Sequence, residues 1–443
     1  MGDLAKKKKK IGAVCIGLSV CVLCAGISAC FGLKNCKKEI PLDPQHGIAD
    51  QSNLFGMCYL LEERSLDSLN IEKEVELMKN LGVKTVRQWT HFTHFMSNPT
   101  TIKQGPALTN MHKLLSECEK AGMINIGMNH HNFCTTRGKS STTAKPFARD
   151  ISAGSEYVQW LNDYYQSWKT LVKEFPEILY WEIDNEVNNP DFMTDGGGKG
   201  SSSYSVRQMA QIATDMFYYA SRAIHEVNPN AQTIMGGLTE PTGLGKGNTL
   251  NFLNMLYDNI QSGDYGYFYG IEDKSGASKN ADDYFQIACW HPYMASFNKE
   301  HFIEINNEFY QVILDREGKH KKVFFTEFGW NDDVVGGEDN AMQFMKLTYE
   351  AIREMPYVET ANIFKLYDTG KKNNWDGPNY QYFGLIHDPD TSRHYPPLEG
   401  DDKAIFIDES GFCIPGAPKR KAYLYQELSG GSGDLTILME EQK

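Results

Sequence analysis

The sequence lacks the features that mark several large protein classes. Its 443 residues contain no G-x-G-x-x-G turn after the first expected strand and no G-x-x-x-x-G-K-[ST] loop, so these two kinds of nucleotide site are not expected. The six cysteines beyond residue 32 form no C-x-x-C pair, which argues against a cysteine zinc site. Positive charge is in deficit, with a net charge of −13. An acidic surface repels phosphate backbones, so no nucleic-acid partner is expected.

The residues that are present describe a globular chain rich in aromatic side chains. Hydrophobic residues make up 41% and charged residues 23% of the sequence, as in folded soluble domains. This composition excludes a collagen-like, coiled-coil or wholly disordered protein. Aromatic residues reach 12%, with 23 tyrosines and 7 tryptophans. Because aromatic rings stack on the apolar faces of sugars, the composition is compatible with a carbohydrate ligand.

The first 32 residues are predicted to be a targeting segment. Five lysines, Lys6 to Lys10, precede an uncharged and mostly apolar stretch of 22 residues, 11–32, which is the layout of a signal peptide. The string Ile-Ser-Ala-Cys that ends at Cys30 resembles a bacterial lipobox. Cys30 is therefore the expected lipidation site, with residues 33–50 as a tether and the protein held at a bacterial cell surface. The alternatives are an uncleaved membrane anchor and plain secretion.

Downstream of residue 50, short apolar stretches alternate with longer amphipathic ones eight times. Strands are predicted at 54–59, 83–89, 123–128, 178–183, 232–236, 285–290, 323–327 and 358–366. Helices are predicted between and after them at 71–81, 107–121, 156–174, 206–227, 250–260, 303–314, 341–354 and 420–428. This pattern predicts an α/β fold, a single-domain (β/α)8 TIM barrel over residues 51–430 with a C-terminal tail at 431–443. An open doubly wound sheet is the alternative.

Two glutamates fall at the ends of the fourth and seventh predicted strands, at Glu186 and Glu327. Barrel enzymes carry their chemistry at the C-terminal ends of the strands, so these carboxyl groups are expected to bracket one bond. Glycoside hydrolysis needs that arrangement. One carboxylic acid protonates the leaving oxygen, and a carboxylate about 5–5.5 Å away attacks the anomeric carbon. At about 6.5–9.5 Å a water would fit between them and the anomeric configuration would invert.

The motifs around these glutamates resemble those of clan A glycoside hydrolases, the retaining barrel enzymes that include families 5 and 39. Trp-Glu-Ile-Asp-Asn-Glu at 181–186 is similar to the acid/base signature, and Phe-Thr-Glu-Phe-Gly at 325–329 is similar to the nucleophile signature. His291-Pro-Tyr293 resembles the His-x-Tyr element, and Arg87 resembles the arginine beside the nucleophile. The resemblance covers most of residues 50–430.

The resemblance implies a role for each matching residue. Glu186 would be the acid/base and Glu327 the nucleophile, while Asn185 would bind the sugar 2-hydroxyl. Arg87 and Tyr293 would orient Glu327, and a neighbouring guanidinium favours the ionised carboxylate that a nucleophile must be. His291 would bind substrate. The sequence departs from many relatives at position 184, where it has Asp in place of an aromatic or small residue.

Other aromatic and histidine residues at strand ends are candidate sugar-binding groups. Trp290 and Trp330 fall at the ends of the sixth and seventh strands, and Trp375 lies in the long segment after the eighth. Core packing is the alternative for each tryptophan. His131, beside His130 after the third strand, is a candidate sugar ligand. Adjacent strand residues point to opposite faces, so this pair is not expected to hold a metal, and no cofactor is predicted.

These features together predict a retaining glycosidase that hydrolyses O-glycosidic, β-configured bonds in an oligo- or polysaccharide. Double displacement would use both glutamates. One alternative is a non-catalytic carbohydrate-binding lipoprotein on the same barrel, which would need the aromatic residues without the carboxylates. The other is a metallohydrolase that uses His130, His131 or His291.

Overall fold

The chain divides into two compact units, Met1–Glu39 and Ile40–Lys443. A computed structural model describes residues of the second unit only. Three residues with predicted roles, Cys30, His131 and Trp375, lie outside the described residues, as does the predicted targeting segment. The described ranges are 49–66, 69–130, 149–190, 192–193, 204–239, 246–270, 276–294, 296–368, 382–390 and 414–439.

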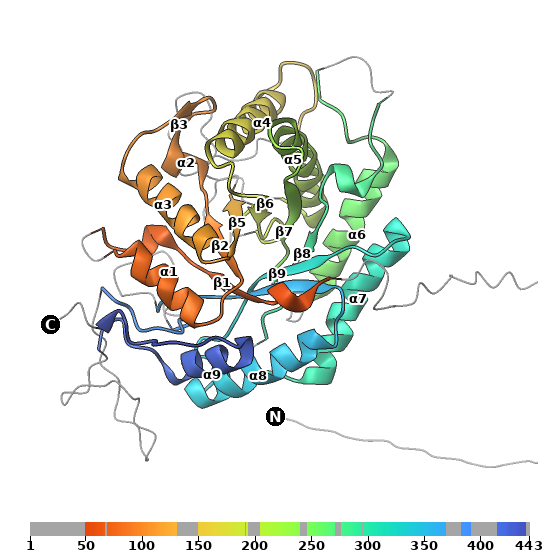
Figure 1. Ribbon diagram of the computed structural model, residues 1–443. Coiled ribbons are helices and arrows are strands. Elements are labelled where there is room, and N and C mark those ends of the chain that lie inside the picture. Colours follow the sequence, from red (N-terminus) through yellow and green to blue (C-terminus); the bar gives the residue numbers. More distant parts are fainter. Residues whose placement is uncertain are drawn as a thin grey trace, which may run out of the picture. The chain divides into compact units, whose positions relative to one another are not determined.

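Parallel strands form the centre of the second unit, and helices surround them (Figure 1). The sheet order is β7-β6-β5-β2-β1-β10-β9-β8. Two parallel bridges, Ile234 with Ile287 and Leu238 with Trp290, join its two ends. The sheet therefore closes on itself, which confirms the predicted (β/α)8 barrel. The barrel strands are β1 (Phe55–Cys58), β2 (Thr85–Trp89), β5 (Ile124–Asn129), β6 (Tyr180–Asn185), β7 (Gln232–Gly237), β8 (Ala288–Cys289), β9 (Val323–Phe328) and β10 (Val358–Ile363).

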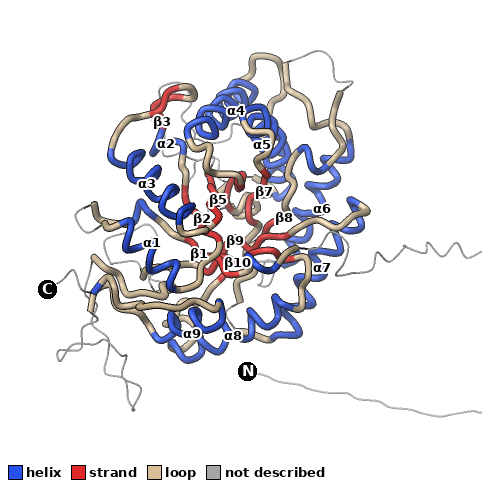
Figure 2. Tube along the Cα trace, viewed as in Figure 1, coloured by secondary structure: helices blue, strands red, loops and turns tan. Residues whose placement is uncertain are grey.

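One long helix follows each barrel strand, and Figure 2 shows these helices outside the strands. Local signals fix their ends. The Ser205 side chain accepts a hydrogen bond from the Gln208 backbone in a capping box at the start of α5, and Gly318 ends α7 in a left-handed conformation. The helices are α1 (Ile71–Asn80), α3 (Pro106–Lys120), α4 (Glu156–Glu174), α5 (Val206–Val227), α6 (Lys246–Ser262), α7 (Lys299–Glu317), α8 (Glu338–Arg353) and α9 (Arg420–Ser429).

Several short elements decorate this plan and were not predicted. After β2 the chain forms α2 (Phe92–Phe95) and a small hairpin of β3 (Met96–Asn98) and β4 (Thr101–Ile102). Three 3-10 turns complete the described elements, namely η1 (Gln51–Asn53), η2 (Leu61–Glu63) and η4 (Ala281–Asp283).

The apolar core lies between the strands and the helices. Large aromatic side chains dominate it, and Trp160, Trp168 and Trp181 are fully buried or nearly so. Polar side chains of β2 and β10 meet across β1, which lies between these two strands, as where the Thr85 and Thr360 hydroxyls lie 2.7 Å apart. Gly56 of β1 makes that approach possible, because a Cβ there would stand 2.3 Å from the Thr85 hydroxyl. Among the described residues, no helix combines the length and the apolar character that crossing a membrane requires.

Candidate active site

Arg87 is the centre of a buried cluster of charges at the C-terminal ends of the strands. From β2, its Nε lies 2.6 Å from Glu182 Oε2 and its Nη2 lies 3.0 Å from Glu182 Oε1. The guanidinium also donates to Asn185 Oδ1 and to Glu327 Oε1. Burial alone would lower the pKa of Arg87, but the charges of Glu182 and Glu327 outweigh burial and raise it well above its ordinary value. The cation therefore persists and joins β2 to β6 and β9.

Glu182 holds this cluster in place. Its side chain is fully buried. Besides the two bonds from Arg87, its Oε1 accepts a hydrogen bond from the Thr326 hydroxyl at 3.0 Å and one from the Gly237 backbone at 3.2 Å. Because both of its oxygens are engaged by strand residues, Glu182 is a structural anion rather than a group that faces a substrate.

Glu186 and Glu327 face one another beside His291. The His291 Nδ1 lies 3.0 Å from Glu186 Oε1 and 3.8 Å from Glu327 Oε2. An oxygen of each glutamate and a nitrogen of this histidine all lie within 4.8 Å of one another. The two glutamates are 8% exposed, whereas Arg87 and Glu182 are fully buried. Solvent therefore reaches the pair of carboxyl groups but not the charges behind them.

His291 stands between the two carboxyl groups and is locked in orientation. Its Nε2 lies 3.0 Å from the Thr326 hydroxyl. Burial alone would lower the pKa of the imidazole, but the carboxylates of Glu327 and Glu186 outweigh burial and raise the pKa above its ordinary value. Gly237 leaves room for the ring, because a Cβ at that position would stand 2.1 Å from Nε2.

The two glutamates have different partners. Glu327 accepts one hydrogen bond on each oxygen, from the Arg87 guanidinium on Oε1 and from the Tyr293 hydroxyl at 3.1 Å on Oε2. Burial and the charge of Glu327 raise the pKa of Tyr293 well above its ordinary value, so the phenol keeps its proton. Glu186 instead contacts His291 on Oε1 and the Asn189 amide at 2.9 Å on Oε2. Glu327 is therefore the carboxylate held beside a permanent cation.

The backbone at the end of β6 adopts unusual conformations. Asp184 has φ 78° and Glu186 has φ 49°, a region that non-glycine residues rarely occupy. The Asp184 carboxylate accepts from the backbone N–H of Asn185 at 2.7 Å, and the Glu186 backbone donates to Gly237 O at 2.8 Å. Such conformations persist where surrounding contacts enforce them, and they cluster at functional sites.

The structure brings together six of the residues with predicted site roles: Arg87, Asn185, Glu186, His291, Tyr293 and Glu327. Three further members of the cluster were not predicted as site residues. Thr326 contacts His291, and the Asn189 amide donates to Glu186. Glu182 accepts hydrogen bonds from Nε and Nη2 of Arg87. Their only sequence signal was position, because each lies within four residues of a candidate glutamate.

Two tryptophans that were predicted to bind sugar lie in the core, which corrects that prediction. Trp290 is fully buried, its indole N–H donates to Asn306 of α7 at 2.6 Å, and its rings pack against Phe325. Trp330 is 5% exposed and packs against Phe328 and Phe344. Neither offers a free face to a sugar ring.

A different set of aromatic side chains borders the cluster. Trp89, Tyr293 and Phe383 are partly buried and pack on a small apolar group of Cys58, Leu60 and Phe364. Tyr293 and Phe383 meet edge to face with centroids 6.1 Å apart. These residues form an apolar wall beside Glu327, where a ring-shaped ligand could stack.

Comparison with protein-family models gives a match over most of the barrel. The family model described as Cellulase (glycosyl hydrolase family 5) matches residues 48–360. No curated protein matches the sequence.

Solved structures share the fold at low sequence identity. A family 39 glycoside hydrolase from Bacteroides cellulosilyticus is 15% identical, with a TM-score of 0.54 over 86% of this chain and 64% of its own. A family 5 enzyme from Bifidobacterium longum, in complex with Manβ1-4GlcNAc, is 12% identical, with a TM-score of 0.55 over 85% of this chain and 78% of its own. A family 1 β-glucosidase from Thermotoga maritima is 12% identical, with a TM-score of 0.56 over 87% and 99%.

Proposed function

Since this chain belongs to glycosyl hydrolase family 5, the cellulase family, and is a glycoside hydrolase, we propose that it is a retaining enzyme with Glu327 as nucleophile and Glu186 as acid/base. The observation that carries the proposal is the spacing of the two carboxyl groups. Their nearest oxygens lie within 4.8 Å. Retaining enzymes need about 5–5.5 Å, whereas inverting enzymes need about 6.5–9.5 Å to admit a water.

The partners of each glutamate support the division of roles. In the first step, the Glu186 carboxylic acid gives its proton to the glycosidic oxygen while Glu327 attacks the anomeric carbon. The bond to the leaving group breaks and a glycosyl ester forms on Glu327. In the second step, Glu186 takes a proton from water, whose oxygen displaces Glu327 and restores the free carboxylate. Arg87 and Tyr293 stabilise Glu327 as it leaves the sugar, because both donate to its oxygens.

Asn185 is oriented to bind the sugar beside the reacting bond. Its Oδ1 accepts from Arg87 at 2.9 Å, which leaves the amide N–H groups as donors toward the ligand. A sugar 2-hydroxyl next to the anomeric carbon is the group that such a donor would meet. Hydrogen bonds to this hydroxyl strengthen in the transition state of glycoside hydrolysis.

The substrate that we propose is a β-linked oligo- or polysaccharide. The apolar wall of Trp89, Tyr293 and Phe383 supports a pyranose ring as the ligand beside Glu327. Two of the similar structures carry names that point to β-linked sugars, a β-glucosidase and an enzyme in complex with Manβ1-4GlcNAc.

Chemical rescue separates the two roles. Glu327→Ala and Glu186→Ala are assayed on an aryl β-glycoside with added azide. We expect the first variant to yield the α-glycosyl azide, because azide replaces the missing nucleophile, and the second to yield the β-glycosyl azide from a glycosyl-enzyme. Glu226→Gln, on the exposed face of α5, serves as the matched carboxylate control with normal turnover. NMR of the product formed by the wild-type enzyme reports its anomeric configuration. An inverted configuration would contradict the role of Glu327.

We also propose that the enzyme is tethered to a bacterial membrane through lipid on Cys30. The motivation is the lipobox-like string before Cys30 and the lysine-rich, apolar layout of the segment. In a bacterial host, wild-type protein should incorporate an alkyne-labelled fatty acid and sediment with membranes, while Cys30→Ala should lose the label. Labelling that is equal in the two proteins would refute the tether at Cys30.

A further inference from the structure

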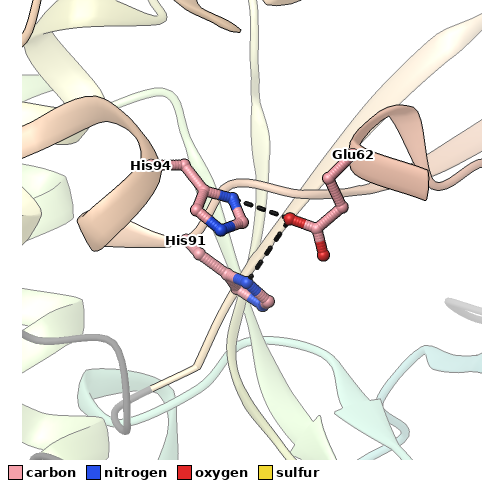
Figure 3. Close-up of side chains that lie close together, drawn as sticks. All are labelled: Glu62, His91 and His94. Carbon is pink, nitrogen blue, oxygen red and sulfur yellow. Dashed lines mark ion pairs between the residues drawn. The ribbon is translucent and has the colours of Figure 1, made fainter. Parts of the chain in front are cut away.

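A second group of metal-ligand side chains lies outside the proposed catalytic cluster. Glu62 belongs to η2, directly after β1. His91 is the N-cap residue of α2, directly after β2, and His94 lies within α2. Figure 3 shows the two imidazoles turned toward the Glu62 carboxylate. Both connections leave the C-terminal ends of their strands, so the group lies on the same side of the barrel as Glu186 and Glu327.

We propose that Glu62, His91 and His94 form a binding site for a divalent transition-metal ion of the Zn²⁺ type. The ligands would be Glu62 Oε2 and the Nδ1 atoms of both histidines, with water in the fourth position. This inference is independent of the proposed glycosidase mechanism, because it rests on the ion pairs among Glu62, His91 and His94, and that mechanism assigns none of the three a step.

The distances fit one ion. The Glu62 Oε2 lies 2.7 Å from His94 Nδ1 and 3.8 Å from His91 Nδ1, and all three atoms lie within 4.8 Å of one another. Zinc binds nitrogen and oxygen at about 2.0–2.2 Å, so tetrahedral ligand atoms stand roughly 3.3–3.6 Å apart. The two observed separations fall on either side of this range. To bind one ion, the Glu62 carboxylate would therefore move away from His94 Nδ1 and toward His91 Nδ1.

The ligand types select the class of metal. Two imidazoles and one carboxylate suit Zn²⁺ and its neighbours in the first transition row, whereas Ca²⁺ and Mg²⁺ prefer shells of oxygen. The site is also accessible from one side. The side chains of Glu62 and His94 are 26% and 35% exposed, while that of His91 is 4% exposed. An ion would therefore rest against a fixed imidazole and keep a position open to water.

Neighbouring contacts show what the ion would hold together. Glu63, the next residue after Glu62, pairs with Lys365 just beyond β10, so η2 is already fixed on one side. The proposed ion would fix its other side to α2. His91 stacks on Trp89 with centroids 5.2 Å apart and an interplanar angle of 25°. The ion would thereby brace the apolar wall to which Trp89 belongs.

Calorimetric titration of the untagged full-length chain with ZnCl₂ tests the site. Wild type should bind with a saturable component that is lost, or weakened at least about 100-fold, in Glu62→Gln and in His94→Ala. His112→Ala is the matched control, since His112 Nε2 lies 2.9 Å from Glu174 in a pair of similar exposure that lacks a second histidine. The control should bind as wild type does. Equal unfolding midpoints of wild type and the three variants, measured in the presence of a chelator, would show that the substitutions leave the fold intact.

Two other groups of described side chains could hold zinc, and both include His291: one with Glu186 and Glu327, the other with Glu182 and Cys289. One further titration separates them from the Glu62 site. His291→Gln removes a ligand from both groups but leaves the Glu62 site complete, so this variant should retain the component that Glu62→Gln loses. Co²⁺ in place of Zn²⁺ should give the intense visible bands of a tetrahedral complex, which Glu62→Gln should abolish. The proposal is overturned if wild type shows no saturable binding, or if Glu62→Gln and His94→Ala bind zinc as wild type does.

Discussion

Replacing Arg87 with methionine should separate two functions of this residue, stability and catalysis. The substitution removes four hydrogen bonds from a fully buried guanidinium and leaves Glu182 without its cation. Deleting one partner of a buried ion pair costs about 3–5 kcal/mol, because the other charge stays buried and uncompensated. We therefore expect urea denaturation to report a free energy of unfolding lower by about that amount.

A second substitution then removes the stranded charge. In the double variant Arg87→Met, Glu182→Gln, a neutral amide replaces the carboxylate and can still accept from Thr326 and Gly237. Most of the lost stability should return, on the order of 2 kcal/mol or more, because no unpaired anion remains. The value of kcat/KM should not return. Glu327 still lacks the cation on its Oε1, and removing one such donor costs about 10²–10³-fold in rate.

The matched control lies at the other end of the barrel. Lys321 precedes β9 and is buried, and it pairs with Asp282 at 2.8 Å and Glu317 at 3.0 Å. Lys321→Met should lower stability and leave kcat/KM unchanged, since the N-terminal face of a barrel serves stability. If kcat/KM recovered together with stability in the Arg87→Met, Glu182→Gln protein, Arg87 would be a counter-ion for Glu182 alone and its proposed role beside Glu327 would be refuted.

Three further predictions follow from single side chains. Gly237→Ala should lower kcat/KM at least about tenfold while the fold is retained, because an added Cβ would stand 2.1 Å from His291 Nε2. Unchanged kinetics would show that the position of the His291 imidazole is not critical for catalysis. The raised pKa of His291 means that its protonation stabilises the folded state. The stability difference between wild type and His291→Gln, from urea titrations, should be largest below about pH 6.5 and shrink as pH rises through the folded-state pKa; a difference that grows with pH contradicts this. Trp290→Ala should cost about 3–5 kcal/mol without raising KM more than other core variants do, and a selective rise in KM would restore a sugar-binding role.

The sequence allowed the main elements to be predicted because their signals are long and periodic. Helices of ten residues or more, such as α4 at Glu156–Glu174, present an apolar face several turns long. The insertion after β2 escaped prediction for the opposite reason. The elements α2, β3 and β4 have four, three and two residues. Such short elements do not repeat the hydrophobic period of a helix, about 3.6 residues, or that of a strand, about two residues. The ligands of the proposed metal site lie at this insertion and at η2, so their meeting was equally invisible.

Strand parity explains why the prediction for Trp290 was wrong. Consecutive residues leaving a strand point to opposite faces. His291 points toward Glu186 and Glu327, so the residue before it must point outward, and Trp290 does reach Asn306 on the covering helix. The prediction placed Trp290 and His291 on the same face. Sequence position identified the strand end correctly, but parity decides which side chain of a neighbouring pair lies in the cleft.

The end of β6 breaks the same parity rule, and this exception makes the site possible. Regular alternation would send Asn185 away from Glu186, yet Asn185 reaches Arg87 while Glu186 reaches His291. The positive φ angles at Asp184 and Glu186 turn the chain so that both neighbours face the cluster. Asp tolerates this conformation better than most residues, and its carboxylate caps the N–H of Asn185. The aspartate at position 184 therefore has a structural role: its short polar side chain stabilises the bend that brings Asn185 and Glu186 to one face.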